Sequence, residues 1–355
     1  MKFLKNKVVI CISLFLVIIL FVCSYYFYLL TPLSDDNSDI VVTIEKGSIT
    51  DIANTLKDNG LIRNVDAFKL YVKLNNINNL QAAIYTLNQT MSVKDIVEKL
   101  ELGDSFNPDE VKITFKEGIN VRQIAKLISD NTNNTIDDVY ALLNDMDYLN
   151  SIIDKYEFLT NDILNEDIYY SLEGYLFPST YIYLNKDVTV KEIVNSMLDK
   201  MNTELQVYND SIASSSFTTH EILTLASMIE LEAITEEDRK LVSSVFKNRL
   251  DINMTLGSDV TTYYAVKLDM YERDLTVSEL NTNNPYNTRG NHLGLPVGPI
   301  CNPSIESINA AINDIDSDYL FFLADNTGKV YFSKTGAEQT AIKNKLINEG
   351  LWNRW

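Results

Sequence analysis

The sequence predicts an α+β fold with one apolar helix at its N-terminus, and two observations carry this prediction. A unit that alternates apolar and polar residues, turns at a glycine and then changes to helical spacing occurs at residues 42–53 and again at 113–125. Helical spacing dominates the stretches between and after these units, so short strands and longer helices share the chain. At 355 residues and 46% apolar composition, the chain is long enough for two or three domains with cores of their own.

The N-terminus has the pattern of a membrane anchor. Three lysines in residues 1–7 precede an apolar run over residues 8–30, which is long enough to cross the hydrocarbon core as a helix. A cleavable signal peptide is the alternative, but its apolar region is shorter and ends at a small-residue site, whereas this run ends in the aromatic band 25–28. We therefore predict a cytoplasmic stub at 1–7, a single transmembrane helix at 8–30, and an extracytoplasmic remainder.

A short polar linker is predicted at residues 31–40 and a small α/β module at 41–105. The module combines the first strand-turn-helix unit, a central helix and a weaker echo of the unit at 85–97, because each unit alone buries too little apolar surface. Pattern alone leaves two roles open for it, glycan binding and plain positioning.

The second copy of the unit opens residues 106–165, which we predict to be a strand-turn-helix followed by a helical connection. A larger mixed α/β domain is predicted at residues 166–355. Three cysteines without a C-x-x-C pair indicate no disulfide framework, so its stability has to come from packing.

Charge and composition exclude several classes of function. Thirty Lys and Arg against 49 Asp and Glu give a net charge of −19, the wrong sign for a protein that neutralises phosphates, so no nucleic acid partner is expected. His220 and His292 are the two histidines, and no cluster of metal ligands is visible in the sequence. We therefore expect no cofactor and no metal.

The segment 220–233 predicts a buried helix that is able to carry chemistry. Thr218 and Glu221 have the spacing of a capping box, which specifies the helix start. Apolar residues cover most of the helix circumference, except for a narrow stripe that ends at Glu230. The stripe contains Thr224, Ser227 and Glu230.

Glu230 has two interpretations from this helix alone. A carboxyl group in a poorly solvated cleft has a raised pKa, which a general acid requires, but a buried ion pair explains the same residue. Glu232 lies about 200° around the helix from Glu230, so the two are not predicted to act as a pair from this helix alone. A buried carboxylate at Glu232 needs a cation, for which Arg239 and Arg249 are the candidates.

Further segments follow at fixed spacing, and their succession resembles the YceG-like family of endolytic murein transglycosylases over about residues 40–352. The segments are A-S-M-I-E-L-E at 226–232, N-R at 248–249, L-G-S-D-V-T-T-Y-Y at 256–264, N-P-Y-N-T at 284–288, G-L-P-V-G-P-I-C-N-P at 294–303 and Y-L-F-F-L-A-D at 319–325. The chain departs from the family pattern at Ser179, Val260, Val297 and Gln339.

The resemblance implies a LysM-like N-terminal module, a YceG-like catalytic domain and a location in the cell membrane of a bacterium. It also implies that Glu230 is catalytic and that other matched residues bind substrate. We predict as substrate-binding residues Ser227, Glu232, Asn248, Asp259, Tyr264, Tyr286, Asn287 and Thr288, together with Glu173.

The activity implied is a lyase that cuts the β-1,4 bond between N-acetylmuramic acid and N-acetylglucosamine in nascent glycan strands and leaves 1,6-anhydro ends, terminating strand elongation. Protonated Glu230 would donate to the glycosidic oxygen and then take a proton from the muramic C6 hydroxyl. The expected partners are glycan strands and, beyond them, cell-wall synthases or division and elongation proteins.

Two alternatives to this activity stay open in the sequence. One is a muramidase that uses water, with Asp259 or Glu173 as the second carboxylate. The other is a glycan-binding scaffold without catalytic activity.

Overall fold

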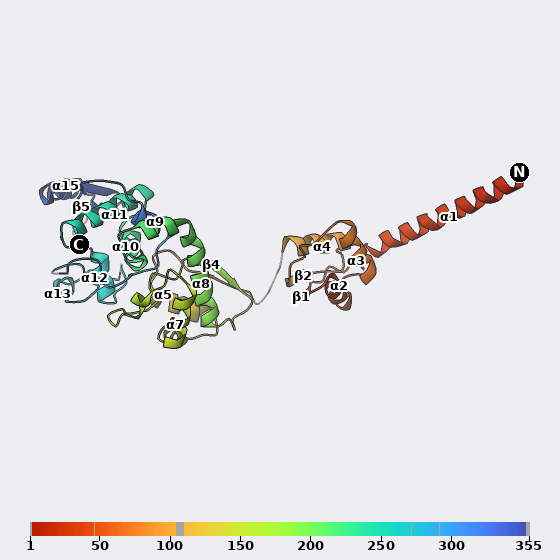
Figure 1. Cartoon of the computed structure of the whole chain (residues 1–355), viewed down its shortest axis with the longest axis horizontal. Coiled ribbons are helices and arrows are strands. Elements are labelled where there is room, and N and C mark those ends of the chain that lie inside the picture. The colour runs from red at the N-terminus through yellow and green to blue at the C-terminus, as the bar shows by residue number, and fades with distance from the viewer. Residues whose placement is uncertain (1, 46, 104–109, 271, 291, 353–355) are drawn as a thin grey trace. The chain divides into compact units, whose positions relative to one another are not determined.

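The computed structural model describes residues 2–45, 47–103, 110–270, 272–290 and 292–352. The chain divides into two compact units, Met1–Glu110 and Val111–Trp355, and both combine helices with two-stranded antiparallel sheets (Figure 1). The α+β class is thus confirmed. The predicted boundary between residues 105 and 106 lies outside the described residues.

The first unit contains a short sheet whose two strands are separated by two helices. Its elements are α1 (Lys2–Leu29), β1 (Ile40–Ile44), α2 (Ile49–Asp58), α3 (Val65–Leu74), β2 (Ala83–Leu87) and α4 (Val93–Leu102). Val42 of β1 lies opposite Tyr85 of β2, and both side chains are buried in one core with Phe68 of α3. The capping boxes that begin α2 and α4 use Ser48 with Asp51 and Ser92 with Asp95.

The predicted membrane anchor is not supported. Among the residues whose side chains are described, no helix has both the length and the apolar character needed to cross a bilayer. The transmembrane helix predicted at residues 8–30 and the single-pass location in the cell membrane are therefore contradicted.

The second unit is built mainly from helices, with two separate strand pairs. The elements of its first half are β3 (Val111–Thr114), α5 (Val121–Asn131), α6 (Ile136–Leu143), α7 (Met146–Lys155), the 3-10 helix η1 (Asn161–Leu164), β4 (Thr180–Tyr183), α8 (Val190–Leu205), η2 (Gln206–Tyr208) and α9 (Asn209–Ser214). Those of its second half are α10 (Thr219–Glu232), α11 (Glu236–Asp251), α12 (Asp259–Ala265), α13 (Val277–Leu280), α14 (Ile305–Ile312), β5 (Phe321–Ala324), β6 (Val330–Ser333) and α15 (Gly336–Asn348).

Helix α10 lies in the middle of this unit and packs against α11 and α14. Every residue from Ile222 to Ile229 is buried, as expected for a helix that is apolar on most of its circumference. One continuous core joins these helices to the β3–β4 pair, in which Val111 lies opposite Tyr183. The division predicted at residue 166 falls inside this unit and stays a prediction.

Candidate active site

Helix α10 carries two carboxyl groups in its last turn. The helix begins at the predicted capping box, in which Thr218 Oγ1 accepts from the Glu221 N–H over 3.2 Å and Glu221 Oε2 accepts from the Thr218 N–H over 2.8 Å. It ends at Glu232, because Ala233 takes an extended conformation with φ −140°. Glu230 and Glu232 therefore lie where the backbone leaves the buried helix.

Both carboxyl groups line the same pocket, of about 440 Å³, which we call the first pocket. The loop after β3, the end of α10, helix α12 and the loop after it form its wall. Residues of the wall include Gly118, Asn120, Arg122, Gln123, Glu230, Glu232, Tyr263, Tyr264 and Asp269. The sequence placed Glu230 and Glu232 on different sides of the helix, but the pocket reaches both because it lies at the helix end.

The carboxyl group of Glu230 is held by the start of helix α14. Its Oε2 accepts from the Ser304 N–H over 3.0 Å, from the Ser307 hydroxyl over 2.6 Å, and from the Ser304 hydroxyl. Ser304 is the N-cap of α14, so Glu230 occupies the end of that helix where backbone N–H groups are unpaired. These contacts fix the orientation of the carboxyl group.

The other oxygen of Glu230 faces an arginine. Whereas Oε2 accepts three hydrogen bonds, Oε1 accepts from Arg239 Nη2 at 3.5 Å. The Nε of Arg239 has no partner among the described residues. The Glu230 side chain is 7% exposed and still forms part of the pocket wall, so it combines the ion pair and the cleft position that the sequence left as alternatives.

Glu232 has a different environment. Ser258 Oγ donates to its Oε1 over 2.6 Å. Burial raises the pKa of Glu232 to about 7 and nearby Asp259 adds to the rise, while the Ser258 hydrogen bond and Arg249 oppose it. A carboxyl group that changes its charge near neutral pH therefore lies two residues from Glu230.

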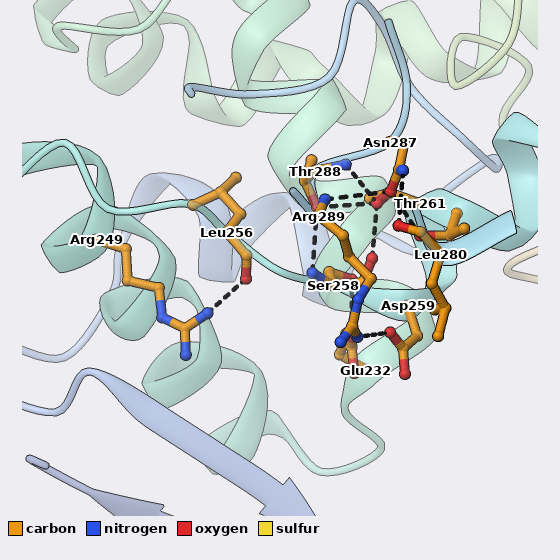
Figure 2. A network of polar contacts seen from close by, with 11 residues as sticks. Glu232, Arg249, Leu256, Ser258, Asp259, Thr261, Leu280, Asn287, Thr288 and Arg289 are labelled. Carbon is orange, nitrogen blue, oxygen red and sulfur yellow. Dashed lines mark hydrogen bonds and ion pairs between the residues drawn. The ribbon is translucent and has the colours of Figure 1, made fainter. Parts of the chain in front are cut away.

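Hydrogen bonds among small polar residues hold the loop segment that contains Ser258 in place (Figure 2). Thr288 Oγ1 accepts from the Ser258 N–H over 3.1 Å and lies 2.9 Å from Thr261 Oγ1. Asn287 Oδ1 accepts from the Thr262 hydroxyl over 2.7 Å. Asn287 and Thr288 are two of the predicted substrate-binding residues. Both are buried, and their hydrogen bonds hold the segment around Ser258 in place.

Three further predicted residues form an interior cluster. Glu173 is 1% exposed and accepts from the Val121 N–H at 3.0 and 3.1 Å, from Tyr264 at 2.9 Å and from Asn302 at 3.1 Å. Burial raises the pKa of Glu173 to about 8, against these hydrogen bonds. Tyr286 is also buried and its ring contacts Tyr264 edge-on. Of this cluster, Tyr264 lines the first pocket.

The remaining predicted residues lie at different depths. Ser227 is fully buried, and its hydroxyl donates to the Thr224 carbonyl and accepts from the Ile300 N–H. Asn248 donates to the carbonyls of Ser317 and Tyr319, which anchors the chain before β5. Asp259 is exposed and forms an ion pair with Arg289.

Sequence reasoning missed the residues that hold Glu230 from outside its own helix. Ser304 and Ser307 follow directly after the matched segment that ends in C-N-P, and their S-x-x-S spacing is that of a helix start. That signal was present in the sequence. The positions of Gly118 and Arg239 beside Glu230 depend on tertiary packing, which no local pattern reveals.

No metal centre is visible in the described part of the chain, because no group of three or more His, Cys, Asp or Glu side chains converges there. Glu230 and Glu232, each with its own hydrogen-bond donors, are among the titratable groups at the end of α10, which also include Glu117 and Arg239.

The fold and the pocket define a mixed α/β protein with two carboxyl groups at the end of a buried helix, and comparison with known proteins gives the family. A family model described as the YceG-like family matches residues 42–345. The chain belongs to the YceG-like family.

Relatives of known name support this assignment. The endolytic murein transglycosylase of Bacillus subtilis is 36% identical over 325 residues, which cover 90% of this chain and 88% of the relative. That of Streptococcus pneumoniae R6 is 33% identical and is matched over 89% of this chain and 60% of its own length. A crystal structure of a YceG-like protein from Listeria monocytogenes superposes with a TM-score of 0.62 at 38% identity, over 87% of this chain and all of that one.

Proposed function

We propose that the protein is an endolytic transglycosylase of peptidoglycan, which cuts the β-1,4 bond between N-acetylmuramic acid and N-acetylglucosamine within a glycan strand. Relatives named endolytic murein transglycosylase at 33–36% identity support it. The structural observation that carries the proposal is the oriented carboxyl group of Glu230 in the wall of the first pocket.

Glu230 performs both proton transfers in this proposal. Protonated at Oε1, it donates to the glycosidic oxygen as the C1–O4 bond breaks and C1 gains oxocarbenium character. The resulting carboxylate accepts the proton of the muramic C6 hydroxyl as O6 bonds to C1. The proton returns to Glu230, no water is consumed, and the strand ends in a 1,6-anhydro sugar. An internal nucleophile held in place has a high effective concentration, so no second catalytic carboxylate is required.

The predicted substrate-binding residues divide into two groups in this proposal. Glu232 and Tyr264 contact the sugar from the first pocket, and Asp259 lies nearby at the surface. The buried residues position the wall without touching the sugar. This second group is Glu173, Ser227, Asn248, Tyr286, Asn287 and Thr288.

The first unit has a part in the proposal as well. Its order of strand, two helices and strand supports a LysM-like glycan-binding module that holds the strand while the second unit cuts it. Nascent strands are the proposed substrate, which makes cell-wall synthases and division or elongation proteins the proposed protein partners.

Digestion of uncrosslinked glycan strands with the purified chain, followed by mass spectrometry, tests the activity. A 1,6-anhydro product has the mass of the uncleaved repeat, whereas hydrolysis adds one water. We expect the anhydro product. Products heavier by one water would show that the protein is a muramidase. Intact strands would favour a glycan-binding scaffold without catalytic activity.

A further inference from the structure

A second pocket, of about 270 Å³, adjoins the first. Its wall is formed by Glu232 and Arg249 from α10 and α11, by the segment Leu256–Asp259, and by the C-terminal elements β5 and α15 with the chain after them. The C-terminal residues of the wall are Phe322, Leu323, Ala324, Gln339 and Trp352. Glu232 and Ala324 line both pockets, so the two meet at the carboxyl group two residues beyond Glu230.

The lining of the second pocket has the chemistry of a sugar site. Trp352 contributes an aromatic ring, on which the apolar face of a pyranose can stack, and Lys343 Nζ lies 5.1 Å from the centre of this ring. The Phe322 ring packs against Phe246 and Phe332. Arg249 donates through Nε and Nη1 to the carbonyls of Leu320 and Leu256, and no hydrogen bond of its Nη2 is found among the described residues. The volume lies just below the ~300–1,000 Å³ typical of small-molecule sites, which suits one ring rather than a disaccharide.

The position of Glu230 decides which sugar each pocket holds. In the proposed reaction its carboxyl group contacts the bridging oxygen and O6, and both atoms lie on or next to the muramic ring. Glu230 lines the first pocket but not the second, so the muramic residue belongs in the first pocket. The next sugar of the strand then passes Glu232 into the second pocket.

We propose that the second pocket binds the N-acetylglucosamine residue that leaves when the strand is cut, with Trp352 stacking on its ring and Gln339 contributing an amide to the wall. The muramic residue, with its lactyl group and any peptide, takes the larger first pocket. This inference rests on the proposed function, since it assigns the leaving-group side of the same reaction.

The test compares two substrates of the purified full-length chain and its variants. One is an uncrosslinked glycan strand, which fills both pockets. The other is a nitrophenyl β-glycoside of N-acetylglucosaminyl-N-acetylmuramic acid, in which nitrophenol takes the place of the leaving sugar. The variants are Trp352→Ala and Gln339→Ala, with Lys345→Ala on the exposed side of α15 as the control.

We expect Trp352→Ala to lower kcat/KM for the strand about tenfold, the effect of losing roughly 1.4 kcal/mol of binding. Gln339→Ala should lower kcat/KM for the strand by a smaller factor. Both variants should cleave the nitrophenyl glycoside at the wild-type rate. Lys345→Ala behaves as wild type on both substrates.

Equal losses on both substrates would place the second pocket on the other side of the cut bond and overturn the inference. Wild-type strand cleavage by Trp352→Ala and Gln339→Ala would overturn it as well. A wild-type chain that forms no anhydro product from strands contradicts the proposed function itself, so the two failures are distinguishable. Circular dichroism of each variant confirms that the fold is retained.

Discussion

The hydroxyl of Ser307 donates a 2.6 Å hydrogen bond to Oε2 of Glu230, so the first turn of α14 fixes the carboxyl group at the end of α10. Ser307→Ala removes one of three donors and leaves both contacts from Ser304. Hydrogen bonds to charged groups contribute about 1.5–3 kcal/mol, and we expect kcat to fall about tenfold from the looser carboxyl group. Strand-cleavage kinetics measure this.

Ser243→Ala is the matched control for Ser307→Ala. Ser243 is buried on α11, but its hydroxyl has no hydrogen-bond partner among the described residues. Its removal should leave kcat unchanged. If both variants lose activity equally, general packing rather than carboxyl orientation explains the loss.

Replacement of Glu230 by Gln should abolish cleavage while the fold and strand binding persist. The amide has the size of the carboxyl group, but it can neither donate nor recover a proton as an acid does. General acid–base catalysis contributes about 10²- to 10⁴-fold, so we expect at least that loss in kcat. Anhydro product formation and strand pull-down measure the two properties, with exposed Glu236→Gln as the control. Wild-type cleavage by purified Glu230→Gln would remove Glu230 from the mechanism.

Glu232 makes stability depend on pH with a definite sign. Its pKa is raised from 4.5 to about 7 in the folded chain, mainly by burial. Between these values the folded protein holds a proton that the unfolded chain has lost, so the free energy of unfolding falls as pH rises through this window. Glu232→Gln removes this contribution and should lose less stability between pH 5 and 7.5 than wild type does.

Urea unfolding at several pH values measures this slope. Glu236→Gln serves as the opposite case, because a hydrogen bond with Lys240 lowers the pKa of exposed Glu236. Glu236→Gln should therefore not reduce the fall in the free energy of unfolding as the pH rises. A Glu232→Gln chain with the wild-type slope would show that Glu232 is charged in the folded state throughout.

Glu173 is expected to act on stability rather than on the reaction. Glu173→Ala leaves the Val121 N–H, the Tyr264 hydroxyl and the Asn302 amide without their buried acceptor. Each buried donor that is left without an acceptor costs about 1–3 kcal/mol. We expect a clear fall in Tm, with kcat within twofold of wild type at temperatures where the variant is folded. A large fall in kcat in a fully folded variant would instead support the predicted contact of Glu173 with substrate.

The sequence predicts those features of the site that depend on local residue patterns. The capping box at Thr218 and the uninterrupted apolar face of α10 are enough to place Glu230 near the end of a buried helix. Local pattern does not reveal that Ser304, 74 residues further along, donates to the same carboxyl group. The family resemblance predicts Asn287 and Thr288 as substrate contacts, and their burial depends on tertiary packing that no local pattern reveals.

Gly118 is the last position at which the structure predicts a loss of activity. Its φ of +77° is a left-handed conformation that L side chains rarely adopt, and an added Cβ lies 3.6 Å from Glu230 Cγ and 3.4 Å from Leu231 Cδ2. Gly118→Ala therefore adds backbone strain of about 1–2 kcal/mol and places a methyl group in van der Waals contact with the Glu230 side chain. Gly290 is the matched control, since its φ is +69° and an added Cβ meets no described atom within 4 Å. Both variants should unfold at lower urea concentration, but only Gly118→Ala should also lose kcat in strand cleavage. If Gly290→Ala loses as much kcat as Gly118→Ala, the effect comes from strain and not from the space beside Glu230.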